Sequence, residues 1–120
     1  MFRVRIKTHF SSAHNLREYQ GNCERLHGHN WHVEAYLKSE TLNNLGMVED
    51  FKDFKKHLKV IIDSLDHVYI NEIEYFKTVN PTSENLAKYI YDKLAEHYGD
   101  KVDKVIVWET ANASAEYSRD

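Results

Sequence analysis

Residues 2–10 constrain the fold most strongly, because their side chains alternate between two kinds along the chain. One set is mostly apolar, namely Phe2, Val4, Ile6, Thr8 and Phe10, and the other set is Arg3, Arg5, Lys7 and His9. Successive side chains of a strand point to opposite faces, so such alternation is typical of a half-buried strand. The chain is therefore expected to begin with an antiparallel strand that has one polar face.

The other periodic segments predict the rest of an α+β fold. Further strands are expected over residues 29–38, 102–109 and 113–118. Between the second and third strands, apolar residues about 3.6 positions apart predict two amphipathic helices. The first would begin after the N-cap Asp50, and the second would run from the N-cap Thr82 to Gly99. The order ββααββ predicts a four-stranded antiparallel sheet with two helices on one face, in a single domain spanning residues 1–120.

The third expected strand has apolar residues on both of its faces. Val105 and Val107 share one face, and Ile106 and Trp108 share the other. Strands of this kind are usually covered on both sides. Because the helices would cover one face only, we expect a neighbouring copy of the chain to cover the opposite face. A homo-oligomer also suits a chain of 120 residues, which buries only a modest core alone.

Composition excludes several classes of partner. The net charge of −3 gives no reason to expect nucleic acid or an anionic membrane surface. No apolar run approaches the roughly 18–20 residues of a membrane span, and the start of the chain lacks the apolar core of a signal peptide. One cysteine cannot form an internal disulfide. We therefore expect a cytoplasmic protein with no membrane partner.

Three of the eight histidines lie close to the only cysteine of the chain. His27 and His29 are two positions apart at the start of the second strand, so both side chains can point at one metal ion. His14 lies near the end of the first strand. Neutral imidazoles bind zinc readily, and three ligands leave a fourth position open. Although any one of these histidines could be a solvent-facing strand residue, together they predict a Zn²⁺ site.

Cys23 has three possible roles. It can be a fourth ligand that closes a structural zinc site, or a base or nucleophile beside the metal, where zinc and Arg25 would lower its pKa. It can also be a small buried apolar residue, although its polar neighbours weaken that interpretation. Spacing alone leaves the ligand and the catalyst equally supported.

Two further sites carry weaker signals. Asp66 can orient His67 and tune its proton affinity at the end of the first helix, although a histidine that caps the helix is the simpler interpretation. Glu109 follows the apolar third strand and can simply be exposed. It can also accept hydrogen bonds from a planar nitrogen heterocycle, for which two carboxylate oxygens are well suited.

Taken together, these segments resemble the 6-pyruvoyl-tetrahydropterin synthase superfamily along nearly the whole chain. The matching motifs occur in the family order at Phe10–His14, Cys23–Asn30, Met47–Phe51, Leu65–Asn71, Pro81–Ala87 and Glu109–Thr110. The resemblance implies the T-fold, with subunits that form trimeric barrels, commonly stacked into hexamers, and active sites between subunits. It also implies a small-molecule pterin triphosphate as the substrate.

The same resemblance implies a role for each candidate residue. It makes His14, His27 and His29 the zinc ligands and Cys23 the catalytic thiol. Asp66 and His67 would be the partner proton-transfer pair. Glu109 would anchor the pterin ring, with Thr110 beside it.

The three residues between Cys23 and His27 resemble the 6-carboxytetrahydropterin synthase branch of the superfamily. This implies conversion of 7,8-dihydroneopterin triphosphate to 6-carboxytetrahydropterin, with release of acetaldehyde and triphosphate, on the route to queuosine and other 7-deazapurines. One alternative is a 6-pyruvoyl-tetrahydropterin synthase that uses the same substrate. The other is a non-enzymatic binding module stapled by zinc, with Cys23 as the fourth ligand.

Overall fold

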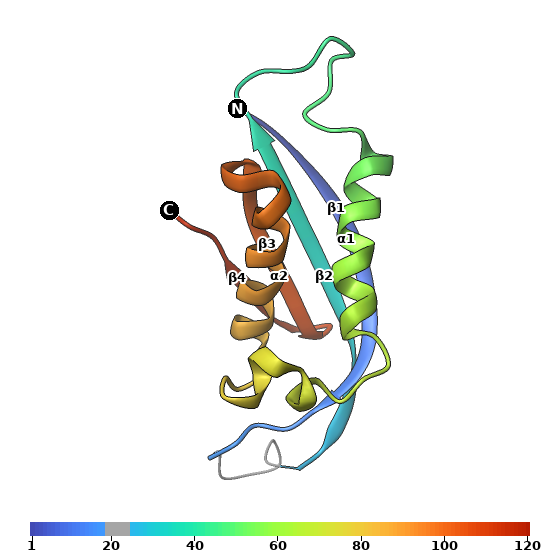
Figure 1. Ribbon diagram of the computed structural model, residues 1–120, viewed down its shortest axis with the longest axis vertical. Helices are drawn as coiled ribbons and strands as arrows, with labels where there is room; N and C mark the ends of the chain where they lie inside the picture. The colour runs from blue at the N-terminus through green and yellow to red at the C-terminus, as the bar shows by residue number, and fades with distance from the viewer. Residues whose placement is uncertain (19–24) are drawn as a thin grey trace.

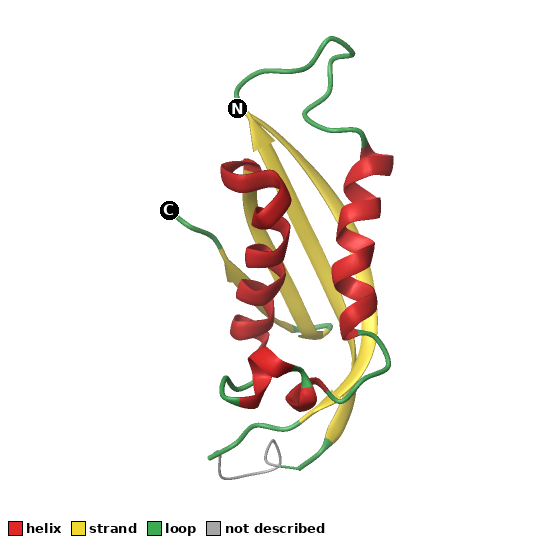
Figure 2. Cartoon of the chain, in the orientation of Figure 1, coloured by secondary structure: helices red, strands yellow, loops and turns green. Residues whose placement is uncertain are grey.

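A computed structural model of the chain describes residues 1–18 and 25–120 (Figure 1). Within these residues, the strands β1 (Phe2–His14), β2 (His27–Ser39), β3 (Val102–Thr110) and β4 (Ala113–Tyr117) form one antiparallel sheet in the order β1-β2-β3-β4. The helices α1 (Phe51–Leu65) and α2 (Ser83–Tyr98) lie on one face of this sheet (Figure 2). The predicted α+β architecture of four strands and two helices is confirmed.

The first hairpin is longer than the alternation predicted. β1 continues to His14 and β2 begins at His27, so these two residues are paired at the end of the hairpin where β1 and β2 are connected. The alternation predicted this strand over residues 2–10, with His14 near its end. The strand continues because residues 65–68 form hydrogen bonds with its last residues. Ser12 Oγ donates to the Leu65 carbonyl and accepts from the Val68 amide.

The core lies between the sheet and the two helices. Its largest fully buried side chain is Trp31 of β2, whose Nε1 donates to the Ser12 carbonyl at 3.3 Å. Buried residues of both helices complete it, namely Phe54, Leu58, Ile62, Leu65, Leu86, Ala87, Ile90, Tyr91 and Leu94. The expected caps are present, since Asp50 accepts from the Lys52 amide at 2.7 Å and Thr82 from the Asn85 amide at 3.1 Å. Gly99 ends α2 with φ 56°, in the left-handed region that favours glycine.

The chain after α1 runs along the outer edge of β1. The His67 amide donates to the Ser11 carbonyl at 2.6 Å, the Ala13 amide donates to the Val68 carbonyl at 3.2 Å, and Ala13 and Tyr69 form an isolated parallel bridge. Two short 3₁₀ helices, η2 (Ile70–Glu72) and η3 (Glu74–Lys77), follow where the sequence predicted a plain loop. As a result, the start of α2 lies at the end of the sheet that carries His14, His27 and His29.

The other face of the sheet carries no helix of the described residues (Figure 2). Arg3, Arg5 and Lys7 are exposed there, while Ile106 and Trp108 are only partly buried. Trp108 Nε1 donates to Glu34 Oε2 at 2.8 Å. That a neighbouring subunit covers this face stays a prediction. Among the helices of residues 1–18 and 25–120, none is both long enough and apolar enough to cross a membrane.

Candidate metal site and its surroundings

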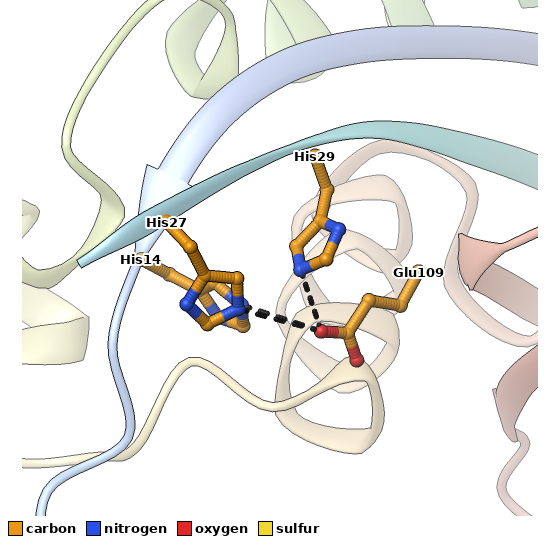
Figure 3. A group of neighbouring side chains, drawn as sticks. All are labelled: His14, His27, His29 and Glu109. Atoms are coloured by element: carbon orange, nitrogen blue, oxygen red, sulfur yellow. Dashed lines mark hydrogen bonds and ion pairs between the residues drawn. The ribbon is translucent and has the colours of Figure 1, made fainter. Parts of the chain in front are cut away.

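Four side chains converge at the end of the sheet where His14 and His27 are paired (Figure 3). They are His14 of β1, His27 and His29 of β2, and Glu109 of β3. One potential ligand atom from each lies within 4.8 Å of those of the others, and these four form the one such group in residues 1–18 and 25–120. The structure thus brings the three predicted histidines together and adds Glu109 to them.

Strand parity and register account for this convergence. β1 and β2 pair His14 with His27 and Ser12 with His29, so the three imidazoles share the face that the helices cover. Glu109 follows Val105 and Val107 at two-residue steps on β3, which places its carboxylate on the same face. Trp31 forms the inner wall, with its ring 4.8 Å from that of His14 and 5.2 Å from that of His29, both edge-on.

Backbone carbonyls fix the orientation of two of the imidazoles. His14 Nδ1 lies 2.8 Å from the Pro81 carbonyl, and His27 Nδ1 lies 2.7 Å from the Arg25 carbonyl. A carbonyl oxygen can only accept, so each Nδ1 carries the proton and each Nε2 presents a lone pair. Metal-bound histidines in proteins usually have this outer-shell arrangement.

The two Nε2 atoms face each other at 3.0 Å. With both protons on Nδ1, two lone pairs are directed at one another, an arrangement that repels unless a cation lies between them. The donor set of this site therefore fits a bound metal ion.

The third imidazole and the carboxylate are also close to this point. His29 Nε2 is buried without a hydrogen bond among the described residues, although Glu109 Oε1 lies 2.8 Å away. The same oxygen is 3.4 Å from His14 Nε2 and 3.8 Å from His27 Nε2. Imidazole nitrogens and a carboxylate oxygen are established zinc ligands, so this set suits Zn²⁺ or a similar divalent ion.

Burial keeps the imidazoles in the form that binds metal. Desolvation is the main reason that the pKa of His14 and the pKa of His29 lie below the usual value of 6.5. The Pro81 carbonyl at His14 and the Glu109 carboxylate at His29 offset only part of the effect. Both rings are consequently neutral at pH 7, and their Nε2 lone pairs are available to a cation.

Asp66 and His67 lie outside this group of four, beside the edge strand β1. Asp66 Oδ1 accepts from the Ser11 amide at 2.9 Å, and Asp66 Oδ2 is 3.0 Å from His67 Nδ1. The Ser11 amide is the main cause of a lowered Asp66 pKa, and His67 adds to it. His67 has φ 55° and a side chain that is 81% exposed, so it points away from its own core.

The remaining predicted site residues lie elsewhere. Thr110, the last residue of β3, is exposed, and its Oγ1 accepts from the Asn112 amide at 3.3 Å. It borders a cavity of about 300 Å³ on the helix-free face of the sheet, together with Lys7, His32 and Trp108. Cys23 lies outside the described residues.

The sequence interpretation missed two features of the site. It did not place Glu109 with the histidines, although the two-residue steps from Val105 and Val107 carried that signal. It also missed the Pro81 carbonyl, for which no sequence signal exists because every residue has a carbonyl group.

Comparison with known proteins identifies the family. Residues 3–120 match the model of the family described as 6-pyruvoyl tetrahydropterin synthase, and the chain belongs to this family. Members of the family catalyse a lyase-type reaction on pterins.

Individual relatives resemble the chain over most of their length. A 6-carboxy-5,6,7,8-tetrahydropterin synthase of Synechocystis is 37% identical, over 90% of this chain and 86% of that protein. A putative enzyme of the same name from Archaeoglobus fulgidus is 38% identical, over 97% and 95%. The solved structure of Caenorhabditis elegans 6-pyruvoyl tetrahydropterin synthase superposes with a TM-score of 0.90 at 29% identity, covering 99% of this chain and 96% of that one.

Proposed function

We propose that the chain is a 6-carboxy-5,6,7,8-tetrahydropterin synthase that converts 7,8-dihydroneopterin triphosphate to 6-carboxytetrahydropterin, acetaldehyde and triphosphate. The names of the Synechocystis and Archaeoglobus relatives support the reaction. The observation that carries the proposal is the group of three histidines and Glu109 in the fold of this family. The product would enter the route to queuosine and related 7-deazapurines.

His14, His27 and His29 would hold Zn²⁺. When bound, zinc would polarise the hydroxyl oxygens of the substrate side chain and make the adjacent positions more acidic. The chain itself would contribute the orientation of the ligands through the Pro81 and Arg25 carbonyls. Trp31 and the covering helices would keep bulk water from the inner side of the site.

We assign the proton transfers to Cys23 and to the pair Asp66 and His67. Cys23 as the thiolate would remove a proton from the substrate, and His67, oriented by Asp66, would transfer one on the other side. Because the pair lies at the β1 edge of its own chain, the complete site would combine the histidines of one subunit with the pair of a neighbour. The edge strands β1 and β4 would then pair between subunits to form the barrel of a trimer or hexamer.

Glu109 would accept hydrogen bonds from the amino-pyrimidine edge of the pterin, with Thr110 beside it. Its position beside the histidines also supports a second role, as a metal ligand in the absence of substrate. Glu109→Gln separates the two roles: loss of substrate affinity with normal metal affinity supports the anchor, and the reverse result supports the ligand.

Product identification tests the proposed reaction. The purified protein with Zn²⁺ and 7,8-dihydroneopterin triphosphate should release acetaldehyde, which can be trapped and identified by mass spectrometry together with the pterin product. A pyruvoyl product without acetaldehyde would instead support the activity named for the Caenorhabditis elegans structure. No turnover in the presence of bound zinc would contradict both enzymatic functions.

Cys23→Ala tests the non-enzymatic alternative. If Cys23 is catalytic, the variant should keep its zinc and its thermal stability but lose turnover. If Cys23 is the fourth ligand of a structural site, metal and stability should be lost together.

A further inference from the structure

The backbone of Arg17, three residues after His14, is held by the side chain of Asn80. The Arg17 amide donates to Asn80 Oδ1 at 2.9 Å, and Asn80 Nδ2 donates to the Arg17 carbonyl at 3.0 Å. One carboxamide therefore satisfies both backbone polar groups of one residue, as a neighbouring strand would. The guanidinium of Arg17 strengthens the contact by donating to the Phe76 and Val79 carbonyls at 2.6 and 2.9 Å.

The backbone of Asn80 is fixed from its other side. Its carbonyl accepts from the Thr82 amide at 2.9 Å and from Asn85 Nδ2 at 3.0 Å. Thr82 is the N-cap of α2, so these bonds tie Asn80 to the rigid start of that helix. Asn80 thus joins α2 to the segment that leads away from His14.

The Pro81 carbonyl, between these two anchors, is the acceptor for His14 Nδ1. It precedes the N-cap, so no amide of the helix competes for it. Proline has no amide hydrogen and cannot fix its own backbone by donating a bond. The position of this carbonyl consequently depends on the residues that flank it, and Asn80 is the one whose side chain bonds Arg17, in the segment that follows His14.

We propose that Asn80 is a positioning residue for the metal site. By clamping the backbone of Arg17, its carboxamide holds the Pro81 carbonyl against His14 Nδ1. That contact keeps the imidazole in the tautomer whose Nε2 lone pair points at Glu109 and the other histidines. The inference rests on the proposed function in one respect, because it assumes that this lone pair binds a metal ion.

Two variants test the clamp with different side chains. Asn80→Ala removes both of its bonds, while Asn80→Asp keeps the shape and replaces only the donor with an acceptor that faces the Arg17 carbonyl. Asn43→Ala is the matched control, because Asn43 Oδ1 likewise accepts from two loop amides, those of Leu45 and Met47, at a position outside the site. Any general cost of removing a loop asparagine appears in the control.

The first readout is the affinity of the purified full-length protein for Zn²⁺, measured by competition with a chelator. Loss of an outer-shell partner typically weakens metal binding about 10–100-fold, and both Asn80 variants should fall in this range. Asn43→Ala should bind like the wild type even if its melting temperature falls equally. Wild-type affinity in the two Asn80 variants would overturn the proposal.

The second readout needs no metal and no turnover. In the metal-free wild type at alkaline pH, imidazole ¹⁵N chemical shifts should show His14 as the Nδ1–H tautomer alone, and Asn80→Asp should show a mixture of tautomers. An unchanged single tautomer in the variant would overturn the proposal. If the wild type binds no Zn²⁺, the proposed function fails, and the tautomer result alone then supports or overturns the positioning role.

Discussion

Burial sets the ionisation of His14 and His29 when no cation is bound. Their folded-state pKa values lie below the usual 6.5, chiefly because of desolvation. The unfolded chain therefore binds more protons than the folded chain as the pH falls through about 6.5. Any stability that depends on these neutral rings is present at higher pH and is lost on acidification.

This ionisation predicts a pH dependence for the metal-free protein. The free energy of unfolding, measured by urea titration, should fall as the pH is lowered from about 7.5 to 5.5. The double variant His14→Gln/His29→Gln should give a flatter profile over the same range. Parallel profiles for the two proteins would contradict the assignment of the dependence to this pair.

Histidines on the two faces of β2 provide a matched pair of variants that tests the predicted metal ligands. His29→Ala should weaken Zn²⁺ binding beyond the roughly 10–100-fold typical of outer-shell changes, because it removes a ligand. His32→Ala changes the same residue type on the same strand but on the opposite face, so its affinity should equal that of the wild type. Both affinities can be measured by chelator competition, and an equal loss in both variants would exclude the proposed ligand set.

At the scale of single residues, the sequence predicted the histidines because strand parity is visible in the spacing. It could not predict the contact between Asn80 and Arg17 or that between Pro81 and His14. These contacts join residues more than sixty positions apart, through groups that leave no pattern in the sequence.

Among the elements, the helices were predicted better than the connections. Asp50, Thr82 and Gly99 lie where capping chemistry predicted the ends of α1 and α2, because capping is local. The end of β1 and the two 3₁₀ helices were missed. Both depend on how residues 65–77 pack against a strand that is distant in the sequence.

Asp66, beside the edge of β1, should make the stability of the fold depend on pH in acid. Its pKa is lowered by the Ser11 amide and by His67, so its stabilising contribution is complete above about pH 4 and disappears as the pH falls through the lowered value. Asp66→Asn should therefore be less stable than the wild type at neutral pH, and the two should converge at low pH in thermal unfolding. Asp63→Asn, which alters an exposed ion pair on α1, should show little difference at any pH.

The fold of one chain does not bring all of the candidate residues together. The histidines and Glu109 lie on the helix-covered face, and Asp66 and His67 lie at the edge of the sheet. The proposed site between subunits would account for this separation. No sequence pattern of a single chain reveals which residues meet across such a boundary, so the resemblance to the family alone led to that expectation.

Subunit complementation tests the shared site. His29→Ala and His67→Ala should each be inactive alone, whereas equal amounts unfolded and refolded together should regain about a quarter of wild-type activity, since random assembly leaves that share of sites intact. Each variant refolded alone is the control. Recovery no greater than the controls would contradict a site built from two subunits. Native mass spectrometry with one variant labelled with ¹⁵N would show whether mixed assemblies had formed.

His14 and His27 are paired next to the connection between β1 and β2, and this position affects how such a sequence can diverge. Arg17 and Arg25 contact the supports of His14 and His27, so we expect a change of length to leave the ligand set intact only if it falls between these two residues. A one-residue insertion between His29 and Trp31 would turn the histidines to the opposite face relative to the core. We therefore expect changes of length to preserve the ligand set between Arg17 and Arg25, and to disrupt it between His29 and Trp31. If Cys23 is the catalytic thiol, as proposed, its distance from the histidines can then change without loss of the proposed metal site.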